Sequence, residues 1–247
     1  MSSPAPSQNE APLDLSRWRI LPNILLIVGG LLSILGAFLD TKQFGFSWLQ
    51  AFMFCLSFSV GALFLVMAHH LFDASWSVGI RRFLEHMACL SFPWLAILFI
   101  PIALLAPKIY SWMSADPHLD HALHAKLPLF TKPAFYIVAA VCFVVWGLIS
   151  SRLRYWSLQQ DKTGAAECTY KMRVVSCIGV VFYALTVTIA VIMWMKALMY
   201  EWFSTMYGVY YFAGSVWLTL ATVYVIAVIL KRNGMLKNVL FEKQFYF

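Results

Sequence analysis

Six long runs without a charged residue constrain this sequence more than any other feature. They cover Ile20–Leu39, Trp48–Ala68, Met87–Ala106, Pro133–Ser151, Val174–Met195 and Val209–Leu230, and none contains Asp, Glu, Lys, Arg or His. Crossing about 30 Å of hydrocarbon takes roughly 20 helical residues. The runs do not alternate as strands of a membrane barrel do, and a helix satisfies its own backbone in lipid. We therefore predict an all-α fold, a polytopic bundle of six transmembrane helices.

The composition supports this prediction, because 62% of the 247 residues are hydrophobic and 12% are charged. A water-soluble domain of this size could not bury so much apolar surface. The first run is too long for a secretory signal and follows a proline-containing polar tail, so we expect it to remain as an anchor. The predicted domains are a polar cytoplasmic tail (1–19), a transmembrane domain (20–230) and a cytoplasmic C-terminal segment (231–247).

The distribution of basic residues predicts the orientation in the membrane. Eighteen Lys and Arg oppose eleven acids. With six spans, the three loops on one side hold only Lys42, Lys108, Lys126, Lys132 and Lys196, while the tail, the other two loops and the C-terminus hold the rest. The positive-inside rule then places both termini in the cytoplasm. We attribute the positive charge to orientation and lipid headgroups, and expect no nucleic-acid partner.

Metal and haem sites are not expected in this chain. The five Cys are scattered, with no close pair and no C-x-x-C-H motif, which argues against disulfides, a zinc site and c-type haem. No predicted span contains His, so a bis-histidine haem is not expected either. A loop set could bind a metal through imidazoles, but we favour a solvated loop; its members are Asp116, His118, Asp120, His121 and His124.

A polar cluster stands at the predicted cytoplasmic end of the second span, in "VMAHHLFDASWSVGIRRFLEHMA". His70 and Asp73 are three residues apart, and Arg81 and Arg82 are four and three residues from Glu85, which are spacings at which helical side chains meet. Histidine titrates near neutral pH, so His70 is a candidate proton carrier within this set. The alternative is that these charges, with Trp76 in an interfacial belt, only mark where a helix leaves the membrane.

Hydroxyl groups recur every three or four residues around the last run. If the helix begins early enough, they form one stripe of Ser204, Tyr207, Tyr211, Ser215, Thr219 and Thr222. Such a stripe is typical of interhelical hydrogen bonding, and the alternative is one wall of a polar or proton-conducting path. Elsewhere, Pro93 and Pro101 are expected to kink the third helix.

Two segments, "HHLFDASWSVGIRRFLE" and "WFSTMYGVYYFAG", resemble signature segments of the polysulfide-reductase/nitrite-reductase membrane-subunit family. The resemblance is strongest to the second subunit of this kind in bacterial alternative complex III, a quinol:electron-acceptor oxidoreductase. "RYWSLQQD" and "KLPLFTKPAFY" add to it, and it extends from about Gly61 onward. The matching residues are His70, Trp76, Ser77, Arg81, Arg82 and Glu85 in the first segment, and Trp202, Ser204, Thr205, Tyr207, Gly208 and Tyr210 in the second.

The resemblance implies a multi-pass subunit of a respiratory complex in the bacterial inner membrane. Its partners would be an iron–sulfur protein, c-type cytochromes and a homologous membrane subunit, with lipid and quinone around it. Iron–sulfur clusters and haems would belong to the partners, since this chain has no redox cofactor motif. Quinol or a polar path would be lined by Trp76, Trp202, Ser204, Tyr207, Tyr211, Ser215 and Thr219.

The sequence departs from the family pattern in two places. Met193 stands where the family has an acidic residue, and Tyr200 stands where it has Pro. Lys196 or Glu201 would have to substitute for the missing acid. Members of the family are longer and carry further helices. The alternatives are therefore a fragment, a truncated gene product or a shortened member, and in the first two 231–247 would be the start of a further part.

From these observations we expect a membrane subunit of a quinol-oxidising complex that anchors electron-transfer subunits and contributes to quinol interaction or proton translocation. The candidate relay consists of His70, Asp73, Glu85, Arg81 and Arg82, and no residue is assigned a direct catalytic role. One alternative is a small transporter or channel, which would need discontinuous helices or charges in mid-membrane; we expect neither. The other alternative is an anchor or assembly protein without a site.

Overall fold

The computed structural model describes residues 16–74, 77–116, 120–127 and 129–232, with side chains from residue 20 onward. Over these residues all regular structure is helical, which confirms the predicted fold class. The chain divides into two units, Met1–Phe44 and Gly45–Phe247, and each is described by itself. The elements are α1 (Ser16–Leu39), α2 (Thr41–Phe72), α3 (Arg81–Ala88), η1 (Cys89–Ser91), α4 (Trp94–Leu98), α5 (Ile100–Ile109), η2 (Ser111–Met113), α6 (His121–His124), α7 (Lys132–Thr163), α8 (Ala166–Trp194), η3 (Lys196–Met199) and α9 (Tyr207–Arg232).

The helices of the described residues define a multi-pass membrane protein. Five of them, α1, α2, α7, α8 and α9, are long and apolar enough to cross a bilayer. A sixth span exists if the bent segment from α3 to α5 counts as one crossing. The structure therefore supports five membrane spans, or six with the bent segment.

The first unit consists of α1 and the turn into α2. Asp40 separates the two helices, and its Oδ1 accepts hydrogen bonds from the backbone N–H groups of Lys42 (2.9 Å) and Gln43 (3.0 Å). An aspartate at this position satisfies the free N–H groups of the first helical turn. The polar residue between two apolar runs thus ends one helix and begins the next.

The third predicted span is broken rather than continuous. The pieces before and after Phe99 meet at an angle of 55°. Pro93 precedes α4, and Pro101 lies in the first turn of α5, where a missing N–H costs no hydrogen bond. The expected bend is present, but the expectation that the protein has no discontinuous helix is wrong, because this segment is a broken span or a re-entrant loop.

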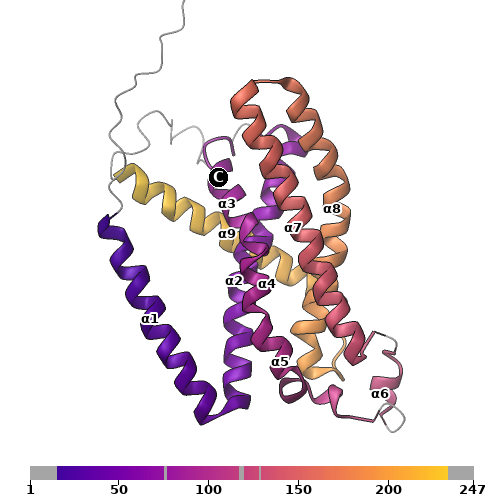
Figure 1. The fold of residues 1–247 in the computed structure, drawn as a ribbon. Helices are drawn as coiled ribbons and strands as arrows, with labels where there is room; N and C mark the ends of the chain where they lie inside the picture. The colour runs from indigo at the N-terminus through magenta and orange to yellow at the C-terminus, as the bar shows by residue number, and fades with distance from the viewer. Residues whose placement is uncertain (1–15, 75–76, 117–119, 128, 233–247) are drawn as a thin grey trace, which may run out of the picture. The chain divides into compact units, whose positions relative to one another are not determined.

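The hairpin of α7 and α8 is longer than the sequence suggests (Figure 1). α7 continues past the apolar run to Thr163, and α8 already begins at Ala166. Gly164 ends α7 with a positive φ of 63°, and its N–H donates to the carbonyl of Gln160 (2.8 Å), a common helix C-terminus. The sequence predicts that the fourth loop, 151–173, extends the preceding helix by a turn or two, and it is instead almost entirely helical. Charged and polar residues at the water boundary continue a helix as readily as apolar ones.

An aromatic cluster joins four parts of the second unit. Trp194 of α8 contacts Phe99, with ring centroids 4.7 Å apart, and Phe143 of α7 at 5.7 Å. Phe52 of α2 lies 5.4 Å from Phe99. The hydroxyl of Tyr110 donates to the carbonyl of Trp194 (2.8 Å). These contacts fix how α2, α7 and α8 face one another and therefore position the polar groups near their ends.

Candidate functional site

The carboxylate of Glu85 lies buried in α3, against α7; we call this the Glu85 end of the second unit. Glu85 is only 2% exposed. Arg81 Nε lies 3.4 Å from its Oε1, and Arg82 Nη1 lies 2.7 Å from its Oε2. Both pairs have the predicted helical spacing. Ser157 of α7 donates to Oε1 at 2.5 Å, so both carboxylate oxygens have partners.

The sequence did not identify the α7 half of this cluster. Asp161 forms an ion pair with Arg82, and it lies 3.8 Å from Arg81 Nη2. Arg82 Nη1 also donates to Ser157 Oγ (3.1 Å). A signal was available, because Ser157 and Asp161 continue the spacing of buried Leu153 on the same helical face. The helix is expected to extend only a turn or two beyond Ser151, so the full length of this face is not predicted.

Two adjacent histidines end α2 near the same cluster. His69 and His70 are 8% and 3% exposed, and their rings meet edge to face with centroids 4.9 Å apart. Nδ1 of His69 is hydrogen-bonded to Oγ of Ser77 at 2.6 Å. Arg81 and Glu85 are close enough to act electrostatically on His69. His70, the predicted proton carrier, is therefore buried beside an ionised network.

Asp73 caps the end of α2 and connects it to α8. It adopts a left-handed conformation with φ 48°, and the N–H of Ala74 reaches back to the carbonyl of His69 (3.1 Å), the pattern of a Schellman cap. The Asp73 carboxylate pairs with Arg173, whose Nε also donates to the carbonyl of His70 (3.4 Å). Asp73 acts electrostatically on His70 while its ion-pair partner lies on α8.

The hydroxyl stripe is shorter than expected, because α9 begins at Tyr207 and Ser204 precedes it. Tyr211 donates to the carbonyl of Met53 (2.6 Å), and Thr219 contacts the carbonyl of Phe58 (3.2 Å). Ser215 donates to the backbone within its own helix, as Thr222 does. These bonds support interhelical packing as the role of Tyr211 and Thr219.

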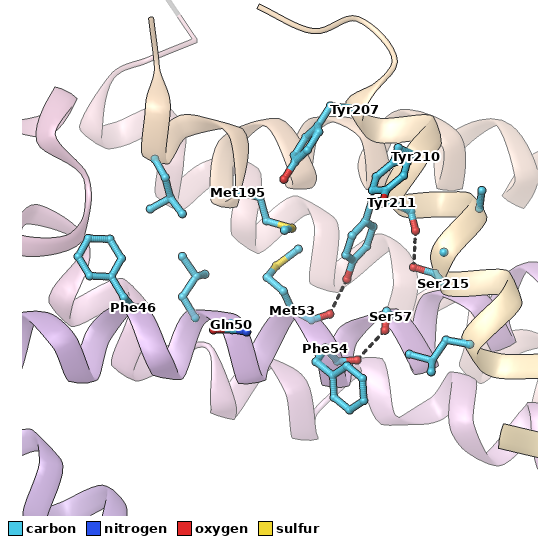
Figure 2. Close-up of a pocket in the computed structure, with 15 residues that line it drawn as sticks. Phe46, Gln50, Met53, Phe54, Ser57, Met195, Tyr207, Tyr210, Tyr211 and Ser215 are labelled. Atoms are coloured by element: carbon cyan, nitrogen blue, oxygen red, sulfur yellow. Dashed lines mark hydrogen bonds between the residues drawn. The ribbon is translucent and has the colours of Figure 1, made fainter. Parts of the chain in front are cut away.

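A cavity of about 670 Å³ lies between the first half of α2 and the first turns of α9 (Figure 2). Phe46 and Met53 line one wall, and Tyr207, Tyr211 and Ser215 line the other. Figure 2 shows the Tyr207 hydroxyl directed into this space. The sequence predicted the lining residues of α9 from their hydroxyl groups. It did not predict the lining residues of α2, because an apolar run does not reveal which face borders a cavity.

The opposite end of the second unit holds a smaller polar group. Tyr200 donates to Asp120 Oδ2 (2.5 Å), and this bond raises the pKa of Tyr200 to about 12. The same bond holds the pKa of Asp120 below its ordinary value. Lys126 Nζ lies 4.2 Å from the centroid of the Phe203 ring, and Lys196 Nζ lies 5.5 Å from it.

The remaining residues singled out in the sequence lie outside the Glu85 cluster and the cavity. Trp202 precedes α9 and contacts the ring of Tyr207, with centroids 5.6 Å apart. Met193 is fully buried in α8, and Glu201 is exposed. Asp120 caps α6 by accepting from two backbone N–H groups, and the described residues contain no group of three metal-ligand side chains. Trp76 and His118 lie outside the described residues.

The fold and this site define the class as a polytopic helical membrane protein with a buried ionic cluster near one end of its bundle. Comparison with protein-family models and with curated proteins finds no match for this sequence.

Proposed function

We propose that this chain is a membrane subunit of a quinol-oxidising respiratory complex and handles protons at its Glu85 end. The observation that carries the proposal is the buried Glu85, paired with Arg81 and Arg82 beside two buried histidines. Ionisable groups inside membrane proteins are costly and usually functional. The resemblance of "HHLFDASWSVGIRRFLE" to respiratory membrane subunits supports the same assignment.

The chemistry of the cluster suits proton transfer linked to quinol oxidation. Oxidation of a quinol releases two electrons and two protons. Imidazole is a side chain that can take up and release a proton, and Arg81 and Asp73 act electrostatically on His70. Electrons would pass to iron–sulfur clusters and c-type haems in partner subunits of the bacterial inner membrane. In this arrangement the chain anchors its partners and moves protons.

The test compares His70→Phe and Glu85→Gln with the exposed variant Glu167→Gln in membranes that contain the assembled complex. Quinol-driven turnover and proton release are measured with a pH-sensitive dye, and assembly is measured by co-purification of haem and iron–sulfur proteins. We expect assembly to persist and turnover to fall about 100-fold for His70→Phe, the lower range for loss of a general acid–base. Glu167→Gln should retain full turnover.

Three outcomes would overturn this proposal in different ways. Normal turnover and proton release in His70→Phe would leave only an anchoring role. Purification without haem or iron–sulfur partners would exclude the respiratory assignment. Solute or ion flux through the reconstituted chain alone would favour a transporter, which the broken third span makes a specific alternative.

The cavity between α2 and α9 favours quinol contact as a second role. It is mostly apolar, and the Tyr207 hydroxyl enters it, as expected for a site that holds a ring and fixes one polar group. Tyr207→Phe should weaken binding of a short-chain quinone to the purified protein about 5- to 10-fold, the value of one hydrogen bond. Tyr210→Phe is the control, because Tyr210 also lines the cavity but is 76% exposed. Equal affinity in both variants would exclude this role for Tyr207.

A further inference from the structure

We infer that a water molecule is bound between α2 and α8, held by His70 and Ser176. Both side chains are buried, at 3% and 0% exposure. His70 Nε2 and Ser176 Oγ have no hydrogen-bond partner among the described residues. Buried polar atoms in proteins are nearly always paired, with protein or with ordered water. Two such atoms on neighbouring helices therefore point to a shared ligand.

The register of the two helices places these residues at the same level. A Cβ built on Gly179 of α8 would lie 3.1 Å from Met67 Sδ of α2, so these two residues face each other. α2 and α8 run in opposite directions, because α2 approaches the Glu85 end and α8 leaves it. A shift of three residues toward that end goes from Met67 to His70 on α2, and from Gly179 to Ser176 on α8. Residues three apart share a helical face.

A second contact confirms this alignment. Arg173 of α8, one turn nearer the Glu85 end than Ser176, donates through Nε to the carbonyl of His70 (3.4 Å). The helices are thus in contact at Met67 and at His70, with Ser176 between the two contact points on α8. At this level of the interface, His70 Nε2 and Ser176 Oγ are both buried and without a hydrogen-bond partner among the described residues.

Water is the ligand class that fits these two atoms. A water molecule can donate to or accept from an imidazole nitrogen in either tautomer, and it can do the same with a hydroxyl group. A metal ion would require more ligands, and the described residues contain no group of three His, Cys, Asp or Glu side chains that could hold one. The role of this water, though not its binding, rests on the proton role proposed above, because the water would extend that path from His70 one step into the α2–α8 interface.

The direction in which Ser176→Ala changes the thermal midpoint tests the inference. If water bridges the two side chains, Ser176→Ala removes a partner of the water and should lower the thermal midpoint of the purified protein by about 2–4 °C. If Ser176 Oγ is simply unpaired, its removal should raise the midpoint, because an unsatisfied buried group is lost. A rise would overturn the inference.

A double-mutant cycle and a vibrational measurement complete the test. His70→Phe and Ser176→Ala should be non-additive, whereas His70→Phe and Ser91→Ala should be additive, since Ser91 is buried elsewhere and donates to the carbonyl of Ala88. Infrared spectra in H₂¹⁸O should show a bound-water band that both His70→Phe and Ser176→Ala abolish. Additive effects, or a band unchanged in both variants, would overturn the inference. A confirmed band with unaltered proton release in His70→Phe would instead reject the proton role and leave the water site intact.

Discussion

At the scale of single residues, two glutamate carboxylates lie in very different environments. Glu85 is buried and has both arginine partners and a serine donor, whereas Glu167 is exposed and pairs with Lys171 on the same helix. A buried ion pair costs desolvation when it forms, but removing one partner leaves an unpaired charge in a poor solvent. The two sites should therefore respond very differently to the same substitution.

Replacing Glu85 by glutamine should destabilise the fold. Glu85→Gln keeps the shape and leaves Arg81 and Arg82 without their shared carboxylate, which should cost about 3 kcal/mol in the free energy of unfolding. Thermal unfolding in detergent measures the change. Glu167→Gln serves as the control and should leave the midpoint unchanged, because an exposed pair contributes little. Equal midpoints for the two variants would show that the Glu85 cluster contributes little to stability.

The pair of Tyr200 and Asp120 should make stability depend on pH in two windows. Asp120 has a lowered pKa, so its contribution is complete above the ordinary carboxyl pKa and is lost as pH falls through the folded value. Tyr200 has its pKa raised from 10.0 to about 12, so its contribution is complete below pH 10 and is lost as pH rises toward 12. The docked pair is therefore most stable at intermediate pH.

Ultraviolet absorbance of tyrosinate measures this effect directly. The difference between wild type and Tyr200→Phe isolates Tyr200, and its midpoint should lie near 12. Asp120→Asn should move that midpoint toward the ordinary value, because the negative charge and the acceptor are both weakened. A midpoint that stays the same in Asp120→Asn would mean that the hydrogen bond does not set the pKa of Tyr200.

At the scale of helices, one glycine sets how closely α2 and α9 approach. A Cβ at Gly61 would lie 2.3 Å from the carbonyl oxygen of Ser215 and 2.4 Å from Thr219 Oγ1. Small residues allow such contacts in membrane bundles. The same crossing places Thr219 near the carbonyl of Phe58, and it keeps α9 against α2 beside the cavity.

Gly61→Ala should force the two helices apart. The expected loss is about 1–3 kcal/mol in the free energy of unfolding, the usual cost of overpacking, and thermal unfolding measures it. Gly214→Ala on α9 is the matched control, because a Cβ there would meet nothing within 4 Å. That control should be neutral or slightly stabilising, since alanine favours a helix over glycine. A Gly61→Ala protein as stable as the control would show that the crossing can relax at no cost.

At the scale of the whole molecule, the prediction concerns orientation. The positive-inside rule assigns the α7–α8 turn to the cytoplasm and the loop after α5 to the opposite side. Lys162→Cys and Ser114→Cys introduce thiols at exposed positions in these two places. A membrane-impermeant maleimide should label Ser114→Cys in intact spheroplasts, and Lys162→Cys only after permeabilisation. The parent protein provides the background from its native cysteines, and the reverse labelling pattern would invert the predicted topology.

The sequence by itself determined the helical class, because the length and apolarity of a run decide whether it can satisfy its backbone in lipid. It also determined the pairs within one helix, such as Arg82 with Glu85, because a helical spacing of three or four residues brings side chains together. Only the tertiary structure decided that Ser157 and Asp161 complete this cluster, that Asp73 pairs with Arg173, and that the expected bend of the third span reaches 55°. Contacts between helices depend on rotation and register, and the packing of the whole bundle sets both at once.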